Sequence, residues 1–253
     1  MDVPATALDA RRDAPPPVRG TRRAGRPRAA PLPASGLSPR EELLAAAAEL
    51  FTRHGYAATT TRAVAERAGM RQATMYHYVG GKQDLLAELL EGTVTPSLAL
   101  AGRLLGDAAQ VPAEARLWYL CRSDVTLLCA GPHNLGALYL LPEVRGERFT
   151  GFHEARHRLK DAYAQLLAST GVCEASGDPH SPDAHSLRTD LVFGLIEGVI
   201  LVHRSAPTRR VETFASAAAD AALRVAGVPD DALPAVREAA AELAGLAELA
   251  ELA

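Results

Sequence analysis

The sequence predicts an all-α protein built from two helical domains. Hydrophobic residues make up 48% of the 253 positions but aromatic residues only 5%, and alanine and leucine dominate. Strand-like alternation of polar and apolar residues is hard to find, so this composition favours helices. A chain of this length has enough apolar residues for two cores, and we expect a small domain over residues 38–92 and a larger one over residues 93–253.

Residues 1–37 are predicted to form a disordered tail, because they are rich in Pro, Ala and Arg and show no apolar periodicity. Within them, Gly25-Arg26-Pro27 resembles the core of an AT-hook, a segment that lies in the DNA minor groove. Ala24 departs from that pattern, since a basic residue is expected there. The alternative is a solvated basic tail that attracts phosphates without sequence preference.

The first helix is predicted to run from Ser38 to His54. Ser38 is a suitable N-cap, Pro39 fits the first helical position, and Glu41 completes a capping box. Apolar side chains then recur on one face at helical spacing. Gly55 is expected to end the helix as the left-handed C′ residue.

A second helix is predicted after a cluster of three threonines. Its N-cap is one of Thr59, Thr60 and Thr61. Its buried face is expected to consist of Val64, Ala65 and Ala68. Gly69 then supplies a tight turn that a side chain would obstruct.

The third helix, about residues 72–79, is polar and aromatic where a core helix would be aliphatic. Gly80-Gly81 ends it, and Lys82 opens a fourth helix. Two short helices joined by a glycine turn are typical of a helix-turn-helix, whose second helix enters the DNA major groove.

This segment resembles the tetracycline-repressor (TetR) family of bacterial transcription regulators over about residues 40–90. The matching positions, in order and without a gap, are Ala47, Leu50, Phe51, Gly55, Tyr56, Thr60, Thr61, Val64, Ala65, Ala68, Gly69, Thr74, Tyr76, Tyr78, Lys82, Leu85 and Leu86. Two features depart from the family: Val79 stands where many members have Phe, and Gly80-Gly81 replaces a polar cap. The resemblance implies a homodimeric DNA-binding regulator, most often a repressor.

The helix-turn-helix also predicts which side chains contact DNA. The candidates are Thr60, Thr61, Arg62, Gln72, Thr74, Tyr76, His77, Tyr78 and Lys82. Gln72 and Thr74 are placed to contact base edges, and the others the groove wall or phosphates. Met75 and Val79 are expected in the core instead, and Tyr78 is compatible with either place.

Further helices are predicted beyond the DNA-binding domain. Their expected ranges are 85–105, with a kink or break at Pro96, then 113–129, a short apolar segment to 141, 147–169, 185–203, 211–225 and 233–252, with a surface loop at 174–185. The helix up to His203 is apolar on more than one face and therefore needs cover on both sides. In the family such late helices form a dimer interface, so Leu195 and Val199 are expected there; the alternative is burial within one subunit.

The resemblance also implies a small-molecule pocket in the larger domain. Its candidate residues are Trp118, Tyr119, Asn134, Tyr139, Phe149, Phe152, Phe193 and Glu197, each with core packing as the alternative. No cluster of basic residues marks this region, so the expected effector is uncharged or weakly charged and largely apolar. No cofactor and no metal are expected.

Charge and cysteine content fit a cytoplasmic regulator. Residues 1–92 carry a net charge of +3 and the remainder −6, as for a protein that presents one end to DNA. The three cysteines, an odd number, argue against a disulfide framework, and Cys121 and Cys129 are expected as small core residues. No run long enough for a membrane span and no signal-peptide core is found.

One motif suggests a different class of protein. His153-Glu154-Ala155-Arg156-His157 matches the His-Glu-x-x-His pattern of zinc proteases, in which two histidines one helical turn apart share a metal. The alternative to the regulator is therefore a helical metal-dependent hydrolase using His153 and His157. A third ligand cannot be identified, so surface histidines on a polar helix are the preferred interpretation.

Overall fold

The computed structural model describes residues 36–131, 133–171, 182–205 and 210–244, in which helices are joined by turns and loops and no strand occurs. The all-α prediction is confirmed for this part of the chain. The DNA-binding domain contains α1 (Pro39–His54), α2 (Thr61–Arg67), α3 (Gln72–Met75) and α4 (Lys82–Gly92). The larger part contains α5 (Thr95–Leu105), α6 (Ala113–Cys129), η1 (Leu135–Leu140), η2 (Pro142–Arg145), η3 (Glu147–Phe149), α7 (Thr150–Ser169), α8 (Pro182–Ser205), α9 (Val211–Ala226) and α10 (Leu233–Ala241).

The first helix begins at the predicted cap and ends before Gly55, but Gly55 has a ψ of 149° and not the predicted left-handed helical conformation. The Ser38 backbone N–H donates to Glu41 Oε2 at 2.7 Å, and the Glu41 N–H donates to Ser38 Oγ at 3.3 Å, which completes the capping box. Gly55 follows with a φ of 86°, a conformation that favours glycine. The helix buries Phe51, whose ring meets that of Tyr56 edge to face at 5.0 Å.

The structure selects Thr60 as the N-cap of α2, since its hydroxyl accepts from the Ala63 N–H at 3.1 Å. Thr59 is buried and donates instead to the Gly55 carbonyl at 2.8 Å. The predicted buried face is present: Val64 and Ala65 are fully buried, and Ala68 packs against the same core.

The third helix is shorter than predicted, because α3 ends at Met75 and not at Val79. Beyond Met75 the chain tightens: His77 N–H bonds to the Thr74 carbonyl and Tyr78 N–H to the Met75 carbonyl, both three residues back. Met75 and Val79 are buried as expected, whereas Tyr78 is exposed. The turn therefore fixes two apolar anchors in the core and leaves the polar side chains between them in solvent.

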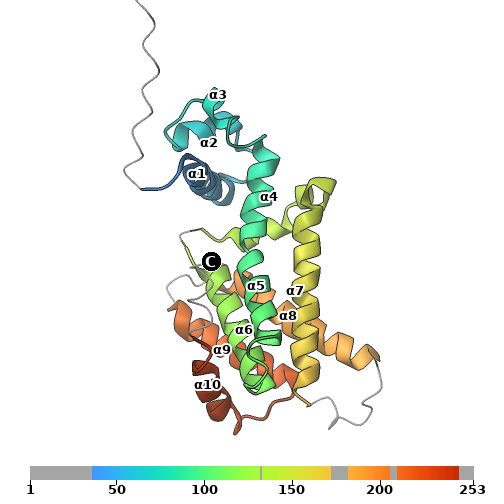
Figure 1. The fold of residues 1–253 in the computed structure, drawn as a ribbon. Helices are drawn as coiled ribbons and strands as arrows, with labels where there is room; N and C mark the ends of the chain where they lie inside the picture. Colours follow the sequence, from blue (N-terminus) through green and yellow to red (C-terminus); the bar gives the residue numbers. More distant parts are fainter. Residues whose placement is uncertain (1–35, 132, 172–181, 206–209, 245–253) are drawn as a thin grey trace, which may run out of the picture. The chain divides into compact units, whose positions relative to one another are not determined.

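The expected break near Pro96 is confirmed. Helix α4 ends at Gly92, and α5 begins at Thr95 with the proline in its first turn, where the missing N–H costs no helical hydrogen bond. Figure 1 shows α1, α2 and α3 packed at the N-terminal end of α4, with α5 continuing from its other end. The α4–α5 junction thus lies between the DNA-binding helices and the larger domain.

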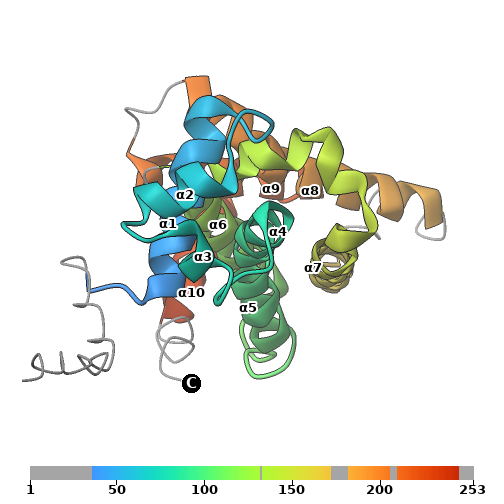
Figure 2. The same cartoon turned by 90° about the horizontal axis from the view of Figure 1, so that it is seen from above.

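Helix α6 is the centre of the larger domain and packs against α5, α7, α8, α9 and α10 (Figure 2). It carries Cys121 and Cys129, which are free and buried as expected. Burial raises the pKa of the Cys129 thiol to about 11, so this cysteine behaves as a small apolar side chain.

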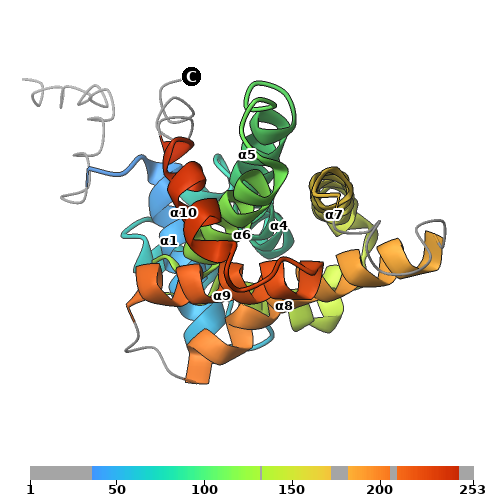
Figure 3. The same ribbon diagram turned by 90° about the horizontal axis from the view of Figure 1, so that it is seen from below.

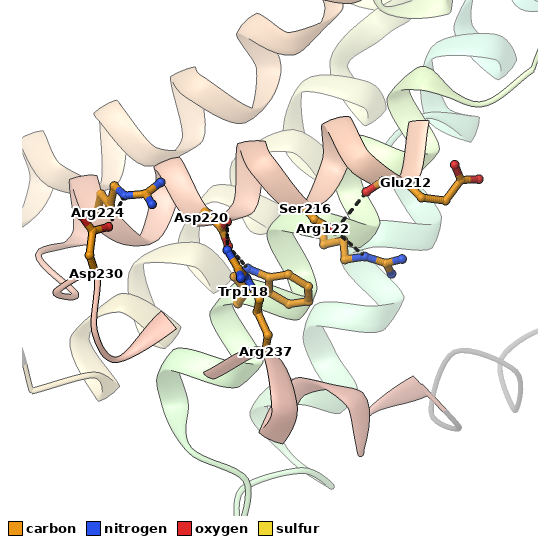
Figure 4. A network of polar contacts seen from close by, with 8 residues as sticks. All are labelled: Trp118, Arg122, Glu212, Ser216, Asp220, Arg224, Asp230 and Arg237. Atoms are coloured by element: carbon orange, nitrogen blue, oxygen red, sulfur yellow. Dashed lines mark hydrogen bonds and ion pairs between the residues drawn. The ribbon is translucent and has the colours of Figure 1, made fainter. Parts of the chain in front are cut away.

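A polar network joins α10 to this centre (Figure 4). Trp118 Nε1 donates to Asp220 Oδ1 at 2.9 Å, and Arg237 Nε donates to the same oxygen at 3.0 Å. Partial burial opposes ionisation of Asp220, but the hydrogen bonds from Arg237 and Trp118 outweigh it and lower the pKa of this carboxyl. Trp118 therefore reports on the α6–α9–α10 contact.

Several predicted features fall at the limits of the described residues. The tail with Gly25-Arg26-Pro27 lies outside them, apart from its last two residues, as does most of the 174–185 loop; however, α8 begins at Pro182, so the loop was predicted about four residues too long. Helix α10 ends at Ala241, well before the predicted 252, and residues 245–253 lie outside the description.

A fully buried carboxyl group, Asp124, ties three helices together. Ser97 Oγ of α5 donates to Asp124 Oδ1 at 2.7 Å, and Tyr163 OH of α7 donates to Oδ2 at 2.9 Å. No cation of the described chain forms an ion pair with it. Burial raises the pKa of Asp124 to about 6, against which the two hydrogen bonds act only in part.

This burial predicts an unusual dependence of stability on pH. The folded pKa lies above the ordinary value of 3.8, so folding favours the protonated acid, and Asp124 costs stability as pH rises from about 4 to about 6. Relative to Asp124→Asn, the free energy of unfolding should fall by about 3 kcal/mol across this window. Urea unfolding of both proteins from pH 4 to pH 7.5 measures the difference. The exposed Asp161→Asn control should show no such slope, and a constant difference for Asp124→Asn would contradict the assignment.

Candidate nucleic-acid interface and body cavity

The start of α2 and the exposed side of α3 carry a connected set of polar side chains. Gln72 Nε2 donates to Thr61 Oγ1 at 2.9 Å, and the Tyr76 hydroxyl lies 3.3 Å from the same oxygen. Hydrogen bonding of the Tyr76 hydroxyl, first with Thr61 and then with Gln72, lowers the pKa of Tyr76. The contacts hold the two helices at a fixed spacing while Gln72 and Tyr76 remain exposed.

The other predicted contact residues mostly share this exposure. The exposed ones are Thr60, Arg62, Thr74, His77 and Tyr78. Arg62 Nε donates to Glu66 Oε1 at 2.8 Å, an exposed pair one turn apart that contributes little and can yield to a phosphate. We refer to Thr60, Thr61, Arg62, Gln72, Thr74, Tyr76, His77 and Tyr78 together as the reading surface.

Lys82 differs from this group, because its ammonium group is half-buried and already engaged. Nζ donates to the carbonyls of Tyr56 and Thr59, each at 2.9 Å, and lies 4.1 Å from the centre of the Tyr56 ring. An ammonium group has three donors, so one is left for a phosphate. Lys82 thus closes the α1–α2 loop onto α4, a role that short-range sequence patterns do not reveal.

Arg71 is a candidate that the sequence interpretation missed. It is the N-cap residue of α3, it is exposed, and its side chain makes no hydrogen bond or ion pair within the described residues. Its place directly before Gln72 was the available signal, because basic side chains at the start of a reading helix commonly contact phosphates.

The positive charge of the N-terminal end does not come from the described helices. Residues 36–92 contain six Lys or Arg and seven Asp or Glu, so the excess lies in residues 1–35. Part of the acidic charge is paired: Glu49 contacts Arg53 and Arg67, and Asp84 pairs with Arg148 at 2.5 Å. The exposed positive side chains are therefore Arg62 on the reading surface and Arg71 beside it.

A cavity of about 370 Å³ lies between η1, α7 and α8. Its lining residues are Gly136, Tyr139, Leu140, Phe152, His153, Arg156, Glu197, Gly198, Ile200 and Leu201. We call this space the body cavity. Most of its wall is apolar or aromatic, with a few placed polar groups, as small-molecule sites commonly are.

Three of the eight predicted pocket residues line the body cavity: Tyr139, Phe152 and Glu197. Two others lie beside it. Asn134 donates from Nδ2 to the Ile200 carbonyl at 2.9 Å, and the Phe193 ring lies 5.1 Å from the Arg156 guanidinium. Trp118, Tyr119 and Phe149 are buried and absent from the cavity wall, so core packing describes them better.

The polar part of the cavity wall is a neutralised pair. Arg156 donates through Nε and Nη2 to the two carboxylate oxygens of Glu197, a bidentate arrangement. Tyr139 adds a hydroxyl that lies 2.5 Å from Thr93 Oγ1, at the α4–α5 junction. The wall therefore carries no net basic charge from this pair, in line with the weakly charged ligand that we expect.

The His-Glu-x-x-His motif does not form a metal site in the described chain. His153 Nε2 lies 2.8 Å from the Val144 carbonyl, and His157 is exposed on the outer side of α7. No group of three potential metal ligands occurs among the described residues. The hydrolase alternative is not supported.

The fold and the reading surface define a helix-turn-helix DNA-binding protein. Within the described chain, no helix is sufficiently long and apolar to cross a bilayer. The model for bacterial regulatory proteins of the tetR family matches residues 43–89. Together with the relatives described next, this match shows that the chain belongs to the TetR family and is a DNA-binding transcriptional regulator.

Solved and curated relatives extend the match beyond the helix-turn-helix. The crystal structure of Mycobacterium smegmatis AmtR is 42% identical, with a TM-score of 0.73, and the match covers 83% of this chain and 96% of that one. The HTH-type transcriptional repressor KstR2 of Rhodococcus jostii is 30% identical over 140 residues, 54% of this chain and 67% of the relative. PfmR of Thermus thermophilus, at 23% identity over 72% of this chain and 97% of its own, shares the fold with a TM-score of 0.57.

Proposed function

We propose that the chain is a cytoplasmic repressor that binds a palindromic operator as a homodimer and is released by a small molecule in the body cavity. The observation that carries this proposal is the reading surface, in which Gln72 and Thr74 stand exposed on a helix braced by Thr61. Repression is supported by the relatedness to KstR2, which is a repressor.

Dimerisation is supported by exposed apolar residues on α8. Leu187, Leu191 and Leu201 are 60%, 55% and 54% exposed. At about 100° per residue, these three lie on one side of the helix with Gly194, Gly198 and Val202. We call these six residues the α8 stripe. Apolar side chains this exposed, in a row along one helix, mark a surface that associates with another protein.

The burial of Val199 moves the proposed interface from Leu195 and Val199 to the α8 stripe. Val199 is buried against the subunit's own core and Leu195 is half-buried at the edge of the stripe. Figure 3 shows α9 packed against α8, so that one side of α8 is covered within the subunit. One face of α8 is therefore buried within its own subunit, and the proposal assigns the other face to the dimer interface.

Effector control is supported by the position of the body cavity. Tyr139 lines the cavity, and its hydroxyl bonds to Thr93, which also donates to the Leu90 carbonyl at 2.6 Å at the end of α4. A ligand that displaces Tyr139 therefore perturbs the helix that carries the DNA-binding domain. Such a ligand releases DNA only if it prefers the conformation that does not fit the operator.

Operator release tests the proposal. The full chain is titrated against DNA from upstream of its own and neighbouring genes, and footprinting should show a two-fold symmetric site. Apolar metabolites and antibiotics are then screened for release of labelled operator by fluorescence anisotropy, since Trp118 lies away from the cavity. An active compound should lose its effect on Phe152→Ala. Equal release from that variant would place the effector elsewhere, and binding without any sequence preference would contradict the proposed regulator.

A further inference from the structure

The body cavity has a deep buried floor and an exposed apolar rim. Phe152 and Ile200 are buried and form the floor, whereas Leu140 is 73% exposed although it lines the same cavity. Leu201 is exposed by more than half and lines it from α8. An apolar rim of this kind leaves the cavity open to water within a single subunit, which weakens the binding of an apolar ligand.

The rim and the α8 stripe share residues. Leu201 belongs to both, and Gly198 of the stripe also lines the cavity. On a helix with about 100° per residue, Glu197 continues from them toward the cavity. A Cβ placed on Gly194 or Gly198 would meet no atom within 4 Å, so the space in front of this part of α8 is open. Because glycine has no side chain, these two positions allow another backbone to approach closely.

We infer that a second copy of this chain, seated on the α8 stripe, closes the body cavity, so that each effector site is completed by the partner subunit. The inference rests on the proposed dimer and effector cavity. A two-fold interface uses the same patch on both subunits, so the partner's apolar α8 face comes to lie over Leu201 and the neighbouring Leu140. Ligand binding and dimerisation then stabilise one another, because each needs the same covered rim.

Thiol labelling measures directly whether the partner subunit covers the rim of the cavity, and it needs no ligand. Leu140→Cys is introduced at the rim and Glu154→Cys on the exposed side of α7 as the matched control, and labelling by a maleimide is followed by peptide mass spectrometry. Each is made in the otherwise native chain and in the Leu187→Glu, Leu191→Glu background, whose two changes lie outside the cavity lining.

In the dimer, the Leu140→Cys thiol should react at least about tenfold more slowly than in the charged background, which corresponds to a protection of 1.4 kcal/mol. Glu154→Cys should react equally in both. If sedimentation shows a dimer and the Leu140→Cys thiol reacts equally fast in the dimer and in the charged monomer, the inference is wrong but the dimer proposal stands. A native chain that sediments as a monomer overturns the inference together with the dimer proposal.

An uncharged apolar dye, N-phenyl-1-naphthylamine, tests the ligand side with the same proteins. Its affinity should fall about tenfold in the charged background, because an apolar wall of roughly 50 Å² contributes on that scale. Tyr139→Ala in the native background should also weaken it, which locates the dye in the cavity. If the folded monomer binds the dye as tightly as the dimer, and Tyr139→Ala still weakens that binding, the partner does not complete the site. The cavity itself then remains a binding site.

Discussion

Replacing Gln72 and Thr74 by Ala should lower the affinity for each operator half-site by roughly 30- to 20,000-fold and relax its sequence preference. Each lost contact to a base edge costs about 1–3 kcal/mol, and both side chains are exposed on α3. Neither residue contributes to the core, so thermal unfolding should be nearly unchanged. Fluorescence anisotropy with the operator and with a scrambled duplex measures both effects.

Arg71→Ala serves as a contrasting variant. An arginine that contacts phosphate binds every sequence alike, so its loss should weaken operator and scrambled duplex equally. The salt slope should fall by about two, one for each subunit of the proposed dimer. Arg158→Ala, an exposed arginine on α7, is the matched control and should leave both affinities unchanged. Unaltered operator selection by the Gln72→Ala, Thr74→Ala protein would show that α3 does not read the bases.

Substitution of Lys82 distinguishes a role in DNA binding from a role in stabilising the fold. Lys82→Ala leaves the Tyr56 and Thr59 carbonyls without their donor, so we expect a loss of stability beside any loss of affinity. The sequence indicated the type of residue but not this role, because the two carbonyls lie more than twenty residues away along the chain.

Local patterns predicted local structure well. The capping box at Ser38 and the break at Pro96 depend on residues within one helical turn, and both are present in the structure. Three adjacent threonines offered equal chemistry for the α2 cap, however, and only the packing of Thr59 against Gly55 leaves Thr60 to cap the helix. Element ends that depend on such packing, like that of α3, were the least predictable.

The body cavity shows the limit of composition as a guide. Tyr139 and Phe152 line it whereas Phe149, equally aromatic and only a few residues away, is buried elsewhere. Arg156 was not a candidate, because its partner Glu197 is 41 positions away and an isolated arginine gives no signal for a pocket. Which aromatic residue faces a cavity is decided by the crossing of η1, α7 and α8, and a single sequence does not specify that crossing.

The sequence also could not predict which side of α8 faces the core of its own subunit. A helix that is apolar nearly all round gives no preferred direction, so Val199 and Leu191 look alike in sequence. The structure buries Val199 in the subunit's own core and exposes Leu191. The residues chosen to test association therefore move from Leu195 and Val199 to positions on the α8 stripe.

Charging the α8 stripe should produce a folded monomer that binds its operator poorly. In Leu187→Glu, Leu191→Glu, two carboxylates replace side chains that are more than half exposed in the subunit, so folding should be nearly unaffected while association is opposed by the burial of charge. A single DNA-binding domain holds one half-site, and losing the linked second one should weaken operator binding by about 10²–10⁴-fold. Sedimentation at micromolar concentration, circular dichroism and anisotropy measure the three effects, with the exposed Gln165→Glu on α7 as the charge control. If the variant remains a dimer, the α8 stripe is not the interface; if it becomes a monomer yet binds the operator as tightly as the native chain, recognition does not require two linked half-sites.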